Sequence, residues 1–207
     1  MRRRTCWVVG ALAAVAVAGG GITVAVASSD GSSGTSSPAT ESADAGFARD
    51  MATHHQQAVE MSYIVRDRTK DEEIRRLAYD IAQTQANQRG MLLGWLDLWE
   101  LPKVPERAPM EWMGMGDMPP GKDGALMPGM ATNTELKELG KLRGRAAEVR
   151  YLQLMTEHHK GGVHMAQGCV ERCEVGAEVR LARGMVESQE SEMELMADLL
   201  KARGAKP

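Results

Sequence analysis

The chain is poor in aromatic residues: Phe, Trp and Tyr make up 4% of its 207 residues, and phenylalanine occurs once. Strand signals are absent, since no segment shows an apolar–polar alternation bounded by turn residues. Paired catalytic carboxylates, a nucleophile elbow and a phosphate-binding loop are also missing. These absences favour an all-α fold and give no support to the enzyme classes that depend on those motifs.

An excess of basic charge is also lacking. The 25 Lys and Arg residues are outnumbered by 28 Asp and Glu residues, for a net charge of −3. Three of the arginines precede residue 5, so a chain without residues 1–27 would have 22 basic and 28 acidic residues and a net charge of −6. Such a charge repels phosphate groups, and no nucleic-acid partner is expected.

The N-terminal 27 residues are typical of an export signal. Basic residues at 2–4 precede an uncharged run of 21 residues, Trp7–Ala27, which ends in small residues before Ser28. We favour a signal peptide, residues 1–27, that is cleaved. An uncleaved N-terminal membrane anchor is the alternative, because the run is also long enough to span a bilayer. Either interpretation predicts an exported protein, extracellular or on the outer face of the cytoplasmic membrane, with membrane contact only through this segment.

Residues 28–45 are rich in Ser, Gly, Thr and Ala. Such a segment cannot bury enough apolar area to fold, so a disordered tether is expected here. The folded domain is then expected at residues 46–203.

Within this domain a motif, M-x-x-H-H-x-x-x-V-x-M, begins at Met51 and again at Met155, 104 residues later. Further identities at the same offset include Gln85 with Gln189. Four of the five histidines lie in the two copies, namely His54, His55, His158 and His159. A fixed-offset repeat of this length predicts duplicated halves, residues 46–100 and 145–203.

Each half is predicted to be a helical hairpin. The first half has a helical pattern over Phe47–Val65, with Asp44 as N-cap, and a second from a capping box at Thr69 to about residue 99. The second half repeats it over Arg145–Cys173 and Ala177–Ala202. Because neither hairpin covers its own apolar face, we expect the two to pack as a four-helix bundle about a pseudo-two-fold axis.

The connector, residues 101–133, is too long for an ordinary bundle loop. It contains six of the 15 methionines within 21 residues: Met110, Met113, Met115, Met118, Met127 and Met130. Their close spacing predicts that several thioethers bind one soft metal ion. An adaptable apolar lid over the bundle is the alternative. A short helix is expected from Asn133 to Leu139.

The repeated motif itself predicts a metal site inside the bundle. With about 100° of rotation per residue, both histidines of each copy flank the inward-facing stripe. Symmetry then brings four imidazoles towards one region, beside Met51, Met61, Met155 and Met165. Di-iron bundles place Glu three residues before His, where both copies here have Met, and imidazole with thioether favours copper, especially Cu(I). Simple core packing of these side chains is the alternative.

Side chains on the partner helices are candidates to complete this site or to orient its ligands. They are Gln85, Gln189, Glu190, Glu192, Met193 and Met196. By contrast, His164 is expected to point away from Met155 and to be exposed.

Cys169 and Cys173 are the cysteines that follow the N-terminal segment. Export to an oxidising compartment favours a disulfide between them. Cysteines four residues apart on a continuous helix are near the upper limit of disulfide reach, so the bond requires the helix to end there. A thiolate pair that extends the row of soft ligands, and two free packing cysteines, are the alternatives.

Together these motifs resemble the exported, ferritin-like proteins of the domain-of-unknown-function family number 305. The resemblance covers about residues 46–201 and rests on three segments: Met51-x-x-His54-His55 with Met61, Met127-Pro-Gly-Met130-Ala-Thr, and Leu154-Met155-x-x-His158-His159-Lys-Gly-Gly-Val-x-Met165. It implies a duplicated, ferritin-like four-helix bundle. It also implies copper binding and copper tolerance, which are associated with some members, although most have no established activity.

The sequence therefore predicts an exported metal-binding protein that sequesters or delivers copper in the cell envelope, as Cu(I) or Cu(II), rather than an enzyme. A metal-acceptor protein of the envelope is the expected partner. One alternative is a metal-dependent oxidase of cuprous or ferrous ions, which would consume oxygen. Another is a helical module of the envelope that binds a partner protein and no metal.

Overall fold

The structure is a computed structural model that describes residues 37–104, 106–117 and 121–206. These residues form five α-helices and one 3₁₀ helix, and no strand occurs among them. The expectation of an all-helical protein is confirmed. The predicted export segment, residues 1–27, lies outside the described residues, as does the first half of the predicted tether, residues 28–36.

Two helical hairpins are joined by the connector. The first hairpin consists of α1 (Ala43–Arg66) and α2 (Glu72–Leu98), and the second of α4 (Arg145–Arg172) and α5 (Gly176–Ala202). The connector contains the 3₁₀ helix η1 (Glu111–Met113) and the helix α3 (Asn133–Lys141). All four hairpin helices and the short connector helix occur close to their predicted positions.

The start of α1 differs from the prediction. Ser42, and not Asp44, is the N-cap, and its side chain accepts a hydrogen bond from the Ala45 amide at 3.1 Å. Residues 43–45, which were expected to belong to the disordered tether, are helical, and Ala45 is fully buried. Ser caps a helix as well as Asp does, and this cap leaves the Asp44 side chain free for another contact.

The predicted capping box at Thr69 is wrong. Asp71 caps α2 and accepts from the amides of Glu73 and Ile74 at 3.1 and 3.0 Å. Thr69 donates its hydroxyl proton to the Glu148 carboxylate at the start of α4. Of the two possible N-caps in this short turn, Asp71 caps α2, and the Thr69 hydroxyl group instead forms a contact between the two hairpins.

An equivalent contact ties the other turn. Asp44, at the start of α1, accepts from the amides of Glu174 and Val175 at 3.0 and 2.8 Å. Asp44 and Glu148 are 104 residues apart, which is the offset of the sequence repeat. Each hairpin therefore uses an acid in its first turn to hold the turn of the other hairpin. Hydrogen bonds to a charged acceptor of this kind are among the stronger ones in proteins, at about 1.5–3 kcal/mol.

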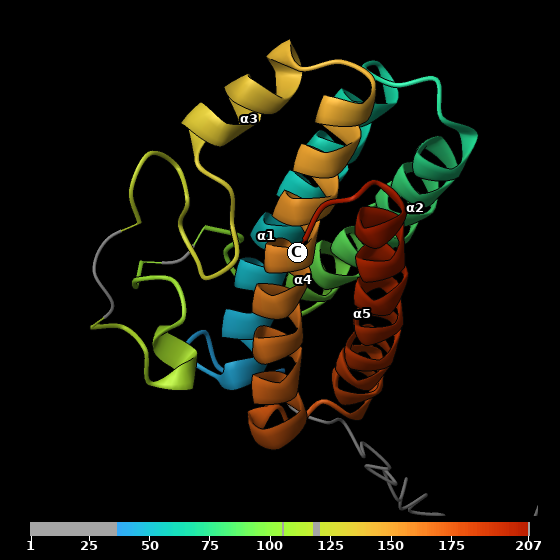
Figure 1. Cartoon of the computed structure of the whole chain (residues 1–207). Helices are drawn as coiled ribbons and strands as arrows, with labels where there is room; N and C mark the ends of the chain where they lie inside the picture. Colours follow the sequence, from blue (N-terminus) through green and yellow to red (C-terminus); the bar gives the residue numbers. More distant parts are fainter. Residues whose placement is uncertain (1–36, 105, 118–120, 207) are drawn as a thin grey trace, which may run out of the picture. The chain divides into compact units, whose positions relative to one another are not determined.

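The hairpins meet through α1 and α4, which run antiparallel at the centre, while α2 packs on α1 and α5 on α4. In Figure 1 the connector and α3 lie to the left of this central pair, and α2 and α5 lie to its right. The histidine motifs of α1 and α4 are thereby enclosed from both sides.

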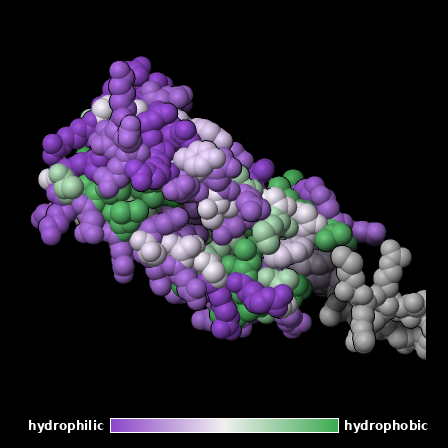
Figure 2. Space-filling model, turned by 90° about the vertical axis from the view of Figure 1, so that its right-hand side faces the viewer, coloured by the Kyte–Doolittle hydropathy of each residue, from purple (hydrophilic) through white to green (hydrophobic). Residues whose placement is uncertain are grey.

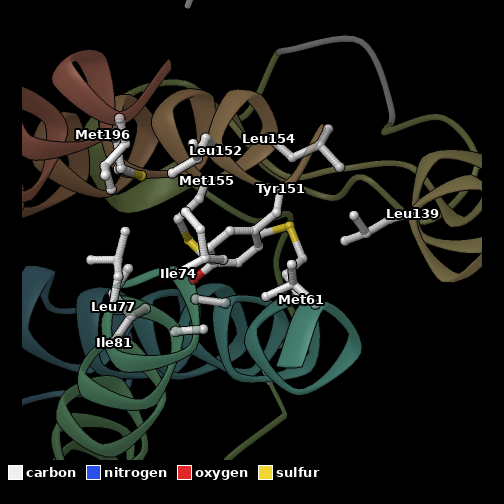
Figure 3. Close-up of a cluster of buried hydrophobic side chains, with 14 of the residues drawn as sticks. Met61, Ile74, Leu77, Ile81, Leu139, Tyr151, Leu152, Leu154, Met155 and Met196 are labelled. Carbon is white, nitrogen blue, oxygen red and sulfur yellow. The ribbon is translucent and has the colours of Figure 1, made fainter. Parts of the chain in front are cut away.

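The core consists of two groups of buried side chains, one at each end of the central helix pair. In the first group, shown in Figure 3, the Tyr151 ring lies between Met61 and Met155, and its hydroxyl group pairs with Ser62 at 3.1 Å. The second group surrounds Phe47 and includes methionines from the connector. Burying each large side chain stabilises the fold by about 1.5–3 kcal/mol.

Hydrophilic residues predominate on the face turned to the viewer in Figure 2, and hydrophobic side chains form smaller patches among them. Among the residues that the structure describes, no helix has the length and apolar character needed to cross a membrane.

Candidate metal centre

His54 and His158 lie against each other where α1 crosses α4. Both side chains are fully buried, and their ring centroids are 3.7 Å apart with an angle of 31° between the planes. The two residues occupy equivalent places in the repeat, so the hairpins meet at the repeated motif itself. His158 Nε2 lies 3.0 Å from the His54 carbonyl oxygen. A carbonyl oxygen only accepts, so this nitrogen carries the proton and Nδ1 of His158 has a free lone pair.

The other two histidines are each oriented by the neighbouring helix of their own hairpin. His55 Nε2 pairs with Gln88 Oε1 at 2.8 Å, and His159 Nε2 pairs with Glu192 Oε2 at 2.6 Å. Glu192 was among the candidates named from the sequence. Gln88 was missed, although the offset of 104 residues points to it directly. Each of these oxygens accepts a hydrogen bond from Nε2–H, so Nδ1 is again the nitrogen left for a ligand.

Several of the imidazole nitrogens have no partner in the part of the chain that the structure describes. Nδ1 of all four histidines is buried without a hydrogen bond, and so is Nε2 of His54. Buried polar atoms are paired in the great majority of cases, so five such atoms in one region are unusual. A neutral imidazole offers one unprotonated ring nitrogen, which is the donor atom that a metal ion requires.

Burial keeps three of these rings, those of His54, His55 and His158, neutral. It lowers the pKa of His54 and of His55 from 6.5 to about 3, and neighbouring imidazoles add to the effect. Burial and the three other imidazoles hold the pKa of His158 well below its usual range. Neutral imidazole is the form that binds metals, so no proton has to be displaced at physiological pH.

The four histidines do not form a preformed three- or four-imidazole cage. Over residues 37–104, 106–117 and 121–206, three His, Cys, Asp or Glu side chains bring their ligand atoms within 4.8 Å of one another in one place only, at Cys169, Cys173 and Glu178. A soft metal ion bound among the histidines therefore needs further donor atoms. Methionine thioethers are the candidates, because methionines flank the histidines in both copies of the motif.

Methionines lie on both sides of the histidines. All four methionines of the repeated motif are fully buried. Met61 and Met155 belong to the first core group, and Met51 and Met165 to the second. Because α1 and α4 are antiparallel, the methionine before the histidines on one helix lies in the same group as the methionine after them on the other.

One end of the connector is fixed over the histidines. Gln57 of α1 donates to the Ala131 carbonyl at 2.9 Å and accepts from the Ala131 amide at 2.6 Å. A Cβ atom on Gly161 would overlap the Pro128 carbonyl, and one on Gly162 would overlap the Gln189 side chain. The two glycines therefore permit the close approach of these groups to α4. The segment Met127–Ala131 is thereby seated on α4.

The other part of the connector packs at the Phe47 end of the core. Asp50 Oδ2 accepts from the Met110 amide at 2.7 Å and from Trp112 Nε1 at 2.9 Å. The predicted connector methionines enter the second core group, with Met110 and Met127 buried and Met113, Met115 and Met130 at its edge. Met118 lies outside the described residues. The connector thus covers the bundle as an apolar lid, and its thioethers face the same core as Met51 and Met165.

The expected disulfide is present between Cys169 and Cys173, with their Cα atoms 4.8 Å apart. As predicted, the helix ends to allow it: α4 stops at Arg172, and Cys173 is extended with ψ at 144°. His164 is exposed, as expected.

The fold and this site define a class: an all-helical protein built of two hairpins, with buried neutral histidines at their contact and methionines on either side. Residues 44–200 match the family described as domain of unknown function (DUF305), and the chain belongs to that family. Among curated proteins, none matches the chain.

Solved structures of the family have the same fold. A predicted secreted DUF305 protein from Streptomyces coelicolor is 75% identical, and the match covers 81% of this chain and 98% of that one with a TM-score of 0.76. A DUF305 fragment from Deinococcus radiodurans is 27% identical, with coverage of 77% and 96% and a TM-score of 0.63.

CopM in its Cu(II)-bound form is 21% identical, with coverage of 77% and 96% and a TM-score of 0.62. Its Cu(I)-bound form gives 19% identity and a TM-score of 0.59 at the same coverage. At these low identities the similarity to CopM shows a shared fold alone.

Proposed function

We propose that this protein is an exported copper-binding protein that sequesters copper in the cell envelope or delivers it to an acceptor protein there. The observation that carries the proposal is the contact of His54 with His158, flanked by His55 and His159, with an unpartnered Nδ1 on every ring. Burying four imidazoles costs free energy that apolar core residues would not cost, whereas four buried imidazoles are well suited to binding a metal ion.

The donor set favours copper over the other transition metals. Imidazole suits copper in both oxidation states, and thioethers select Cu(I). The ligands proposed are those that the sequence indicated, with His54, His55, His158 and His159 at the centre. Met51, Met61, Met155 and Met165 lie on the flanks, and the connector methionines give the ion its route in. CopM, which shares the fold, has been solved with Cu(I), Cu(II) and silver.

The proposal includes the arrangement and location of the protein. The two hairpins form a ferritin-like four-helix bundle that arose by duplication, which accounts for the equivalent pairs His55–Gln88 and His159–Glu192. Residues 1–27 direct export, in line with the secreted Streptomyces relative. Copper is cargo here, so the protein releases it unchanged.

Copper content and Cu(I) affinity of the chain without residues 1–27 test the proposal. Replacing His54 and His158 by Gln should reduce the affinity at least about tenfold, whereas His164→Gln, on the exposed face, should leave it unchanged. A connector variant with Leu at its six methionines should slow loading. Wild-type protein that binds no copper above background would sink the proposal, and steady oxygen consumption with Cu(I) or Fe(II) would replace it with an oxidase.

A further inference from the structure

The two hairpin turns differ in three positions that the repeat makes equivalent. The first hairpin has Val65, Thr69 and Ile74, and both Val65 and Ile74 are fully buried apolar residues. The second hairpin has Cys169, Cys173 and Glu178 at the corresponding places, 104 residues on. The same fold is thus built once with ordinary core residues and once with two sulfurs and a carboxyl group. Packing alone does not require the second set.

Burying the Glu178 carboxyl group at this position costs folding free energy. Its side chain is fully buried, and neither carboxyl oxygen has a hydrogen-bond partner among the described residues. Burial, with the neighbouring Asp44 as a second cause, raises its pKa to about 9. A buried polar group without a partner destabilises a protein, and the equivalent Ile74 shows that an apolar side chain fits this place in the fold.

The three groups are close together and firmly held. Cys169 Sγ, Cys173 Sγ and a Glu178 carboxyl oxygen all lie within 4.8 Å of one another. Asp44 fixes the turn between them through the amides of Glu174 and Val175. Cys169 is buried, whereas Cys173 is partly exposed, so a reagent from solution reaches the disulfide at Cys173.

We propose that Cys169, Cys173 and Glu178 form a redox-gated site for a borderline divalent cation such as Zn²⁺, closed as the disulfide and opened by reduction to the dithiol. Two thiolates and one carboxylate are a ligand set that Zn²⁺ accepts in tetrahedral coordination, with one position open to solvent or substrate. A carboxylate is too hard to be a preferred Cu(I) ligand, which separates this site from the histidine centre. The proposal does not depend on the copper function.

The opening step needs a dithiol reductant. One thiolate of the reductant attacks Cys173 Sγ, the bond between the two sulfurs breaks, and Cys169 leaves as a thiolate. The second thiolate of the reductant then attacks the mixed disulfide and releases Cys173. Two electrons and two protons pass from the reductant, which becomes a disulfide. Binding of the cation displaces the two thiol protons and the Glu178 proton, and it supplies the partner that the carboxylate lacks.

Co²⁺ is a suitable probe, because thiolate-to-cobalt charge transfer gives an absorption band that imidazole ligands do not produce. The chain without residues 1–27 is titrated with Co²⁺ in its disulfide form and after reduction, and Zn²⁺ is then added as competitor. We expect the band in the reduced protein only, at one equivalent, and its loss on addition of Zn²⁺. The bridge closes a short loop, so its reduction should leave the helices intact by circular dichroism.

Two variants complete the test. Cys169→Val with Cys173→Thr copies the first hairpin and should abolish the band while the protein stays folded. Glu178→Gln keeps both sulfurs and should weaken Zn²⁺ binding about tenfold or more, because a neutral amide replaces an anionic ligand. A reduced wild type that unfolds or shows no band would overturn the proposal, and so would equal affinities of wild type and Glu178→Gln. Copper binding by the histidines should be the same in all these variants.

Discussion

Replacing Glu178 by Gln should change how the stability of the disulfide form depends on pH. Burial raises the pKa of Glu178 from 4.5 to about 9, so between these values the native protein holds a proton that the unfolded chain releases. The unfolded state then binds fewer protons, and the free energy of unfolding falls as pH rises, by about 1.4 kcal/mol per pH unit. From pH 7.5 to 8.5 the wild type should lose about 1.2 kcal/mol, which corresponds to a melting temperature about 2–5 °C lower.

Urea denaturation at pH 7.5, 8.0 and 8.5, in the presence of a chelator, measures this slope. The window lies at least one pH unit above the usual histidine pKa and below the pKa of Glu178, so few other groups contribute. Glu178→Gln has no proton to lose and should give a nearly flat profile, while Glu187→Gln, on the same helix, should keep the wild-type slope. If wild type and Glu178→Gln decline equally with pH, the carboxyl group is hydrated in solution and the reasoning is wrong.

Two further predictions concern the histidine centre. Burial lowers the pKa of His54 and His55 from 6.5 to about 3, so the unfolded chain takes up more protons than the native protein as the pH falls. Stability should therefore decrease on acidification, by about 2.3 kcal/mol per histidine between pH 6.5 and 4.5. Denaturation curves of the metal-free protein should show this loss of stability, and those of His55→Gln a smaller loss. Wild-type curves that coincide at pH 6.5 and pH 4.5 would contradict the prediction. Gly161→Ala should destabilise the protein by about 1–3 kcal/mol, since its Cβ would displace the Pro128 carbonyl, whereas Gly90→Ala, with open space around it, should stabilise by about 0.5–1 kcal/mol. Equal melting temperatures for these two variants would show that the connector is not seated on α4.

Local sequence patterns predicted the helices well because each helix carries its own periodicity and is long enough to show it. They failed at the ends, where several side chains compete for the same amides. Ser42 and Asp44 are both good N-caps, and Thr69 and Asp71 both precede α2. Which of them caps the helix depends on the contacts of Asp44 and Glu148 with the opposite hairpin, and these contacts span more than 70 residues of sequence.

For the site, the repeat identified the four histidines and the methionines beside them, since identical residues at one offset stand out without a structure. The repeat also indicates Gln88 as the hydrogen-bond partner of His55, because Gln88 is equivalent to Glu192, the partner of His159. Glu178 gave no such signal, because a single Glu among 28 acidic residues looks like any solvated side chain. Its burial beside the disulfide became evident only from the packing of the second turn.

The sequence by itself determined the helices, their pairing into two hairpins and the repeated positions of the histidines and methionines, and it favoured the disulfide, because each of these follows from neighbours in the chain or from a repeat. The tertiary structure alone decided that His54 meets His158 at the crossing of α1 and α4, that the Nδ1 atoms have no partners, and that the connector closes over them. These features depend on which faces of distant helices come together, and that is set by the packing free energy of the whole core.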